Sequence, residues 1–520
     1  MEANMDRTGT FSKTLLAAAL VAAFVISLAG MVDPLLSVGV AAAAAVFLFL
    51  IRKPVYGIVL VILATPFSGS AWLDEQIAGI PGAKITNLLV MAAIGFLVIS
   101  MKPARLHKLD RTFIYGVIIL FTIAVFRSTS YIGLTYNMIW QDEYSFGRYI
   151  LSHLIRPLLI FAPFILIVCY VRSREDVKKI AVATMLSIVA LAFTLLVLYA
   201  LFTPDKLNFE MVREGFKEML GMHGNNLADF FIAVYPLLLA YTVSKKNPFF
   251  VMGLAVSLGA IGIIYSRSAY LVVLICTFAF FIFSRRGKFV PLILGAGAVG
   301  FSFIPQTIIQ RAVTGFANND LNDISAGRIN DIWLPLINEF LGQPLKLLIG
   351  AGRYAIMGTE AFKNGLTLRV GHAHSMYLDT LLDSGIIGLG FFLIFFFLFL
   401  RRFIAAHKII EDRSLLDILI GIEISVVAFL IRGFSDSFFF PTLTNAFLWI
   451  NLGLGAAIVY SCQPAGGRKA SAPEMEQKAG GIEAAEDLPV QEGEQGTAAD
   501  GADEFLYTGS VMHYESIKEK

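Results

Sequence analysis

Two arginines and a pair of histidines provide side chains that could act together on a diphosphate. Arg267 stands in a very short segment between two apolar runs, and Arg328 precedes an amphipathic segment. Guanidinium groups grip a diphosphate through paired hydrogen bonds, better than lysine can. His372 and His374 follow at positions i and i+2. An imidazole, with a reference pKa of about 6.5, is suited to take a proton from a hydroxyl group at neutral pH.

Each of these residues also has a simpler explanation. Arg267 could anchor a helix end at a membrane interface, and Arg328 could be a solvated loop residue. The histidines could be hydrogen-bonded loop residues, or they could begin a metal site. No carboxylate or cysteine at the usual zinc-ligand spacing completes such a site in the sequence, so we expect no metal.

The composition indicates which elements position these side chains. Of 520 residues, 57% are hydrophobic and 15% are charged, whereas a soluble domain has about 25% charged residues. Apolar runs of roughly 16–24 residues recur along the chain, the length that a helix needs to cross a bilayer. A membrane β-barrel would show strands of ~10 residues with alternating polar and apolar side chains, and a nucleic-acid-binding protein would need a clustered basic face. The sequence shows neither pattern. The sequence therefore predicts an all-α polytopic membrane protein.

We expect about fourteen transmembrane helices within a membrane domain at residues 1–462. The first, Leu15–Gly30, resembles a signal sequence, but no A-x-A site follows it, so we interpret it as a retained signal anchor. The other predicted spans are Leu35–Ile51, Val55–Phe67, Asn87–Met101, Phe113–Phe126, Tyr149–Val171, Ile180–Phe202, Leu227–Val243, Phe249–Tyr265, Ala269–Phe283, Phe289–Ile304, Gly385–Leu400, Leu415–Ile431 and Leu443–Tyr460.

Basic residues indicate the orientation of these spans. They cluster in alternate connections, as the positive-inside rule predicts for cytoplasmic loops, and this pattern places the N-terminus inside. The largest outer connection, Pro305–Ser384, has helical patterning around Asp331–Phe340, and we expect it to be folded. Residues 463–520 carry twelve acidic and five basic residues and few aromatic ones, which predicts a disordered cytoplasmic tail without a catalytic role. The remaining outer connections are Ser68–Thr86, Arg127–Arg148, Thr203–Asn226, Ser266–Ser268 and Gly433–Thr442.

Arg213, in the outer connection before residue 221, is a further candidate for a phosphate contact. Glu210, Glu214 and Glu218 lie at helical spacing around it. Such carboxylates are ordinary ion-pair partners on a helix surface, so a solvated charge is the competing interpretation.

Three more charged residues lie near the predicted outer face. Asp379 and Asp383 are four residues apart and share one helix face. Carboxylates beside a diphosphate would repel it, so we expect neither to contact the donor. Arg156 lies inside an apolar run, where an isolated charge is costly. Its position indicates a partner or a polar cavity.

Several short motifs here resemble those of bacterial O-antigen ligases and O-antigen polymerases. Residues His374–Gly388 are similar to the signature H-[NSQ]-x9-G-x-x-[GTY], and Arg267 with Leu271 matches R-x3-L. The segment Gly221–Ala228 is similar to the glycine- and asparagine-rich start of a span in that superfamily. Residues 327–333 and 350–352 resemble its large periplasmic loop. The resemblance extends over about residues 221–400.

The resemblance implies a GT-C-type membrane glycosyltransferase that is inverting, metal-independent and free of cofactors. Such an enzyme moves a glycan from an undecaprenyl-diphosphate carrier onto an acceptor hydroxyl. By the same resemblance, Arg267 and Arg328 would hold the donor diphosphate, and His374 would orient or deprotonate the acceptor hydroxyl. We expect Arg213 and His372 to add substrate contacts. Asn226, in the glycine- and asparagine-rich motif, is a further expected substrate contact.

The resemblance also implies where the protein works. The implied location is the bacterial inner membrane, with the active site facing the periplasm. The acceptor would be a glycan or a lipid core, and other polysaccharide assembly proteins are further candidate partners.

Two alternatives remain open at the level of sequence. A lipid-linked oligosaccharide flippase or another transporter would have a similar number of spans. Transporters are usually built from repeats with sites near the bilayer midplane, whereas this chain shows no evident repeat and its candidate charges lie at the outer edge. Within the enzyme interpretation, a ligase and an exopolysaccharide or O-antigen polymerase share the same donor chemistry.

Overall fold

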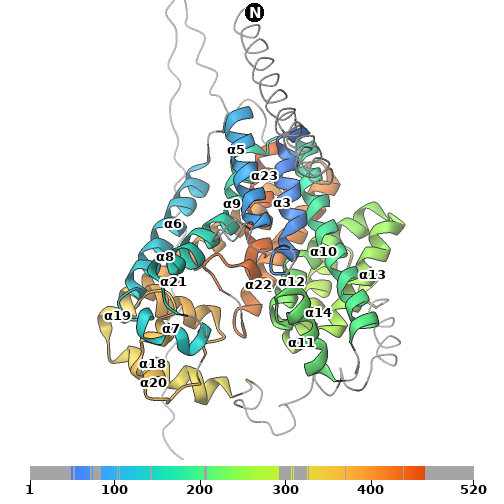
Figure 1. The fold of residues 1–520 in the computed structure, drawn as a ribbon. Coiled ribbons are helices and arrows are strands. Elements are labelled where there is room, and N and C mark those ends of the chain that lie inside the picture. Colours follow the sequence, from blue (N-terminus) through green and yellow to red (C-terminus); the bar gives the residue numbers. More distant parts are fainter. Residues whose placement is uncertain are drawn as a thin grey trace, which may run out of the picture. The chain divides into compact units, whose positions relative to one another are not determined.

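The computed structural model consists of helices and the segments that join them (Figure 1). It describes residues 49–50, 53–70, 73, 84–101, 103–104, 106–140, 143–203, 208–291, 306, 309, 322, 325, 327–368, 370–436 and 438–462. Within these residues no β-strand is formed. The prediction of an all-α polytopic protein is therefore confirmed. The predicted tail at residues 463–520 lies outside the described residues.

The described residues include seven helices long and apolar enough to cross a membrane, and four shorter apolar ones. Together they match eleven of the predicted spans, while Leu15–Gly30, Leu35–Ile51 and Phe289–Ile304 lie wholly or largely outside the described residues. The long ones are α6 (Lys108–Ser128), α8 (Phe146–Ile150) continued through a π-helical turn (Leu151–Ile155) into α9 (Arg156–Tyr170), α10 (Arg174–Phe202), α12 (Gly224–Lys245), α21 (Met376–Ala406), α22 (Arg413–Arg432) and α23 (Ala446–Cys462) after a 3-10 turn (Leu443–Asn445). The shorter ones are α3 (Val55–Ala64) with a 3-10 turn (Thr65–Phe67), α5 (Ile85–Ser100), α13 (Pro248–Ile263) and α14 (Arg267–Phe283).

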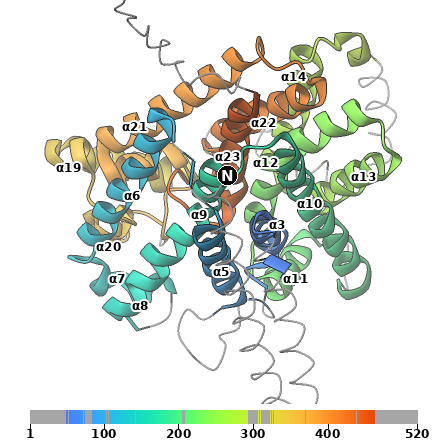
Figure 2. The same cartoon turned by 90° about the horizontal axis from the view of Figure 1, so that it is seen from above.

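Helices α12, α22 and α23 form the interior of the assembly, as the view from above shows (Figure 2). Helix α12 packs along α22, and α23 packs on α9 and α10. In the most apolar stretch of each helix, 83% of the residues of α12 are buried, whereas only 39% of those of α21 are buried. A charged residue on α12 must therefore find a partner inside the protein.

Four residues from predicted cytoplasmic helix ends meet in one cluster. One nitrogen of Arg402, at the end of α21, binds both carboxylate oxygens of Asp110 at 2.8 and 2.9 Å. Tyr460, near the end of α23, donates to the same carboxylate. Arg172, after α9, lies 4.1 Å over the Tyr460 ring. These contacts agree with the alternation of loops predicted from the basic residues.

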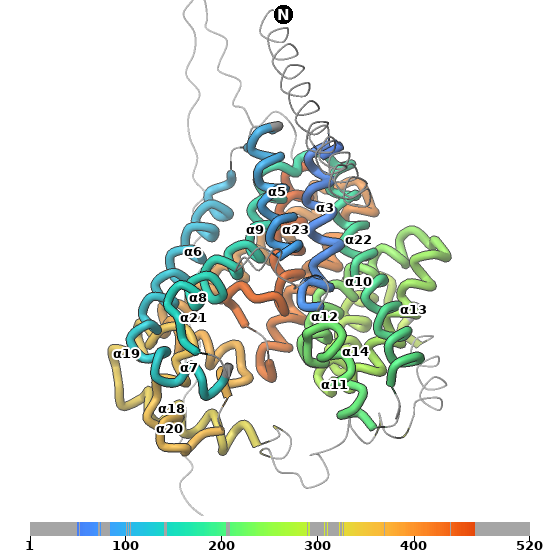
Figure 3. Tube along the Cα trace, in the orientation of Figure 1, coloured from blue at the N-terminus to red at the C-terminus, as the bar shows by residue number. Residues whose placement is uncertain are grey.

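Short helices occupy the connections predicted to be outside, toward the lower end of the view in Figure 3. The folded character expected of the large connection is present from residue 327 onward in the part that the structure describes. The short elements in these connections are α7 (Ile132–Trp140), α11 (Phe209–Leu220), a π-helical turn (Ile329–Trp333) continued by α18 (Leu334–Leu341), α19 (Pro344–Ile349), a 3-10 turn (Ala355–Gly358) and α20 (Glu360–Lys363). A further 3-10 turn at Gly287–Phe289 follows the other end of α14, in a connection predicted to be cytoplasmic.

Gly385 divides α21 into a short outer part and a long apolar part. Its φ of 69° and ψ of −170° belong to a region that residues other than glycine avoid. A side chain at Gly385 would also meet the carbonyl oxygen of Leu348 at 2.2 Å. Glycine is required here because it lets α19 dock against the kink. The first turns of α21 therefore run in a different direction from its long apolar part, and their polar side chains lie beside the large connection.

Candidate active site

His374 ends the segment that leads from the large connection into α21. Its φ of 52° is left-handed, which is uncommon outside glycine and requires support from neighbouring contacts. Its backbone N–H donates to Nδ1 of His372 at 3.2 Å, and the two ring centroids are 4.0 Å apart. Burial lowers the pKa of His372 to about 3, and the charges of His374 and Arg353 act in the same direction. His372 is therefore a neutral imidazole whose Nδ1 accepts a hydrogen bond.

The backbone between the two histidines is fixed from both sides. Nε1 of Trp333 donates to the carbonyl oxygen of Ala373 at 2.7 Å. The N–H of Ala373 donates to Oδ1 of Asp379, also at 2.7 Å, and that carboxylate is only 5% exposed. Asp379 thus binds the backbone of the histidine segment, a role compatible with the expectation that it does not contact the donor.

Trp333→Phe should slow the glycan transfer that the motif resemblance implies, without unfolding the protein. The change removes one hydrogen bond to Ala373 but keeps an aromatic ring, and such a bond contributes about 0.5–1.5 kcal/mol. We expect kcat to fall roughly 2–10-fold with KM nearly unchanged, because the contact positions His374 and does not bind substrate. Steady-state transfer kinetics would measure this effect. Asn330→Ser, an exposed neighbour, is the matched control, and equal kinetics in the two variants would contradict the positioning role.

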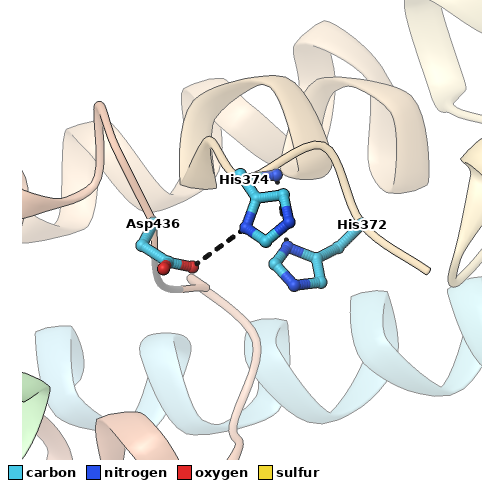
Figure 4. Close-up of side chains that lie close together, drawn as sticks. All are labelled: His372, His374 and Asp436. Atoms are coloured by element: carbon cyan, nitrogen blue, oxygen red, sulfur yellow. Dashed lines mark hydrogen bonds and ion pairs between the residues drawn. The ribbon is translucent and has the colours of Figure 1, made fainter. Parts of the chain in front are cut away.

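Asp436, in the connection after α22, faces His374 from a distant part of the sequence (Figure 4). Its Oδ1 lies 3.7 Å from Nδ1 of His374. The two segments meet because the N–H of Met376 donates to the carbonyl oxygen of Gly433 at 2.8 Å. Burial alone would raise the pKa of Asp436, but contact with His374 and the charge of Arg432 outweigh burial and hold this pKa well below its usual range. Asp436 is therefore an ionised carboxylate that can orient the imidazole of His374.

Arg328 reaches the same connection from the large loop. One guanidinium nitrogen donates to the carbonyl oxygen of Ser435, next to Asp436. Burial lowers the pKa of Arg328, and the nearby charges of Arg432 and Arg267 lower it further while Asp436 opposes them. The loop therefore folds back and brings Arg328 to the histidine cluster, and Arg328 is not a solvated loop residue.

Arg432, at the end of α22, connects the parts of this cluster. It is 2% exposed and binds Asp229 of α12 through Nε at 2.8 Å. Nη1 donates to the hydroxyl groups of Ser268 at 2.7 Å and Ser435 at 2.8 Å, and Nη2 lies 3.5 Å from Asp436. Sequence reasoning missed this residue. The signal was present, because an arginine at the outer end of a span departs from the positive-inside pattern just as Arg267 does.

The remaining candidates from the sequence border the same cluster. Arg267 is the first residue of α14, next to the Ser268 that Arg432 binds. Arg213 donates from Nη2 to Asn225 at 3.2 Å. Asn225 in turn donates to Asp436 at 3.2 Å. The side chain of Asn225 therefore links the glycine- and asparagine-rich motif to the site.

Asn226 occupies the first turn of α12, half-buried, and its N–H donates to the carbonyl oxygen of His223 at 2.9 Å. Arg213 donates to Nδ1 of His223 and to the side chain of Asn225, both at 3.2 Å, while Glu214 pairs with Lys217 at 2.8 Å. The interpretation of Arg213 as a merely solvated charge is thus replaced by a role in the network around Asp436.

Two other charged positions have structural roles. Asp383 binds the buried guanidinium of Arg353 at 2.7 Å and accepts from the N–H of Ala355 at 3.0 Å. It thereby fixes the turn after α19 against α21. Arg156 lines a cavity of about 40 Å³ together with Thr65 and Asn87. This volume is enough for ordered water, although most of the other lining side chains are apolar.

His372, His374 and Asp436 could in principle hold a metal ion, because their ligand atoms lie within 4.8 Å of one another. The sequence offered no carboxylate at the usual spacing, and Asp436 joins the histidine pair only through the fold, since local spacing cannot reveal a partner contributed by the next outer connection. The surroundings nevertheless disfavour a divalent cation. Arg328 and Arg432 both act electrostatically on this cluster, and such positive charges favour an anion over a cation.

Comparison with protein families decides the relationship. Residues 252–393 match the family model for O-antigen ligase. This region is similar to the O-antigen ligase family. It contains Arg267, Arg328 and His374, and the superfamily resemblance of the motifs is confirmed. The apolar helices and the match to the O-antigen ligase family together identify a membrane protein with a glycan-transferring function of this type. No curated protein matches the chain.

Proposed function

We propose that the protein transfers or polymerises a glycan from an undecaprenyl-diphosphate carrier onto an acceptor hydroxyl at the outer face of the bacterial inner membrane. The observation that carries the proposal is the convergence of Arg328 and Arg432 on the pair formed by His374 and Asp436. Guanidinium groups beside an imidazole–carboxylate pair suit a reaction with an anionic leaving group and a hydroxyl nucleophile.

In the proposed reaction, His374 acts as the general base. Asp436 orients the ring through Nδ1, which leaves Nε2 to take the proton of the acceptor hydroxyl, as in other histidine–aspartate pairs. The acceptor oxygen forms a bond to the anomeric carbon while the bond between that carbon and the diphosphate oxygen breaks. Attack from the opposite face inverts the anomeric centre. Undecaprenyl diphosphate leaves with the bonding electron pair.

The arginines stabilise the leaving group. Arg328 and Arg267 would bind the diphosphate oxygens, and Arg432 keeps their surroundings in place through Ser435 and Ser268. Negative charge grows on the diphosphate as the glycosidic bond breaks, so preorganised guanidinium groups act more strongly on the transition state than on the bound donor. This arrangement replaces the role that a divalent cation has in many other transferases.

Chelators should leave the reaction unaffected. Because the positive charge beside the diphosphate comes from arginines, we expect transfer rates in EDTA and in buffer with added Mg²⁺ or Zn²⁺ to agree within about twofold. The measurement is product formation by purified protein after dialysis against EDTA. A rate that collapses in EDTA and returns with one metal would instead assign the cluster of His372, His374 and Asp436 to a metal.

A deletion strain tests the proposed function and separates its two forms. Single repeats attached to the acceptor, with long chains absent, would indicate a polymerase. Long chains that accumulate on the lipid carrier would indicate a ligase. Normal surface glycan together with normal carrier-linked intermediates would contradict both.

A further inference from the structure

A groove beside the cluster lies along one face of α11 and reaches His223, the residue that precedes α12. It has a volume of about 590 Å³ and is lined by Phe209, Glu210, Met211, Arg213, Glu214 and His223. Small-molecule sites usually have volumes of about 300–1,000 Å³. Helix α11 buries its opposite face through Val212, Phe216 and Leu220, so the groove-lining side chains are held on a packed helix.

Two chains of contacts join this groove to the candidate active site. On one edge, the ring of Phe209 lies 6.2 Å from the ring of Tyr265, which is buried two residues before Arg267. On the other edge, Arg213 binds Asn225, which binds Asp436. The groove therefore adjoins both the diphosphate side and the histidine side of the site.

Glycine at position 224 makes the second connection possible. A side chain there would lie 2.9 Å from Nε of Arg213 and 3.0 Å from the carbonyl oxygen of Ile264. Because glycine has no side chain, Arg213 can lie across the start of α12 and reach Asn225. The glycine- and asparagine-rich motif thus shapes the wall between groove and site.

The groove chemistry differs from that of the arginine cluster. Glu210 and Glu214 are exposed carboxylates, and Glu214 is only partly neutralised by Lys217 at 2.8 Å. Such carboxylates repel a phosphate but accept hydrogen bonds from hydroxyl groups, while Arg213 and His223 can donate. The half-buried ring of Phe209 offers an apolar surface for the C–H face of a sugar ring. These properties suit a neutral carbohydrate.

We propose that this groove binds the sugar residues of a substrate next to the reacting carbon. The proposal rests on the proposed function and extends it, because it assigns the carbohydrate to α11 and the diphosphate to the arginine cluster. Arg213 accordingly contacts sugar and not phosphate. The same chemistry serves a sugar of the donor or a sugar of the acceptor, and kinetics distinguish the two.

Phe209→Leu and Glu210→Gln test the groove, with Glu218→Gln on the same helix but outside the groove as the matched control. Transfer by purified protein in nanodiscs is measured with the host's carrier-linked glycan as donor. We expect KM for one substrate to rise roughly 5–10-fold with kcat within about twofold, since one lost polar or packing contact corresponds to this range. Inhibition by inorganic pyrophosphate should stay at the wild-type level in both variants.

The kinetic outcomes distinguish a donor glycan from an acceptor glycan, and they distinguish failure of the groove proposal from failure of the proposed function. A raised KM for the donor assigns the groove to the donor glycan, and a raised KM for the acceptor assigns it to the acceptor glycan. Wild-type KM values in both variants, with active wild-type protein, would overturn the groove. If wild-type protein forms no product, the proposed function fails instead. Saturation-transfer NMR with the oligosaccharide released from the carrier then tests the groove alone, with binding lost in Phe209→Leu and kept in Glu218→Gln as the expected result. Equal binding in the two variants would overturn the groove.

Discussion

His374→Ala should reduce transfer by about 10²–10⁴-fold, the usual contribution of a general acid–base group. The variant should still bind the lipid-diphosphate donor, because the arginines and not the imidazole contact the phosphates. The loss should therefore appear in kcat, with donor affinity near that of the wild type. Single-turnover assays and donor binding by purified protein in nanodiscs would measure the two quantities separately.

His407→Ala is the matched control for this experiment. His407 binds Glu423 at 2.7 Å and belongs to a connection predicted to lie on the opposite side of the membrane. Normal activity in this control, beside a strong loss in His374→Ala, would locate the effect in the candidate site. Full activity in well-expressed His374→Ala would show that the imidazole is structural and that another group activates the acceptor.

Arg328→Ala should weaken donor binding and slow transfer together, by roughly 10²–10³-fold in kcat/KM, as expected when one preorganised donor to a growing anionic charge is lost. Arg328→Lys should recover only part of this loss, because an ammonium group lacks the planar two-pronged geometry of a guanidinium group. Arg267→Ala and Arg267→Lys should behave in the same way. Donor titrations and transfer rates of the four variants would test this expectation.

Arg174→Ala, an exposed arginine at the start of α10, controls for loss of positive charge elsewhere. Arg432 is less suitable for this test. Removing it would leave Asp229 buried without its ion-pair partner, a change that often destabilises a protein by about 3–5 kcal/mol. Lysine variants as active as wild type would argue for simple charge neutralisation and against bidentate binding of the diphosphate.

Hydrophobic length and loop charge predicted the membrane helices well because both are local properties of the chain. The short helices α7 and α11 were not specified by those signals, since each is too short or too polar to resemble a span. The break at Gly385 coincides with the predicted start of a span, although the preceding turns are already helical. A hydropathy pattern marks only the apolar part of such a helix.

The site could be predicted only where its residues belong to short motifs. Arg267, Arg328 and His374 were identified by type and spacing, and the fold brings Arg328 to the segment that faces His374. Asp436 escaped prediction because nothing in its local sequence indicates His374 as a partner. That contact depends on packing between the end of α22 and the start of α21.

The most direct test of the central claim is transfer by purified protein in nanodiscs supplied with carrier-linked glycan and two acceptors, a lipid core and a second carrier-linked repeat. The account predicts a new glycosidic product from one of these acceptors, with one undecaprenyl diphosphate released per bond formed and almost none in His374→Ala. Movement of the carrier-linked glycan across the bilayer without a new bond would contradict it and favour a transporter. Product formation at the wild-type rate in His374→Ala would contradict the assigned chemistry.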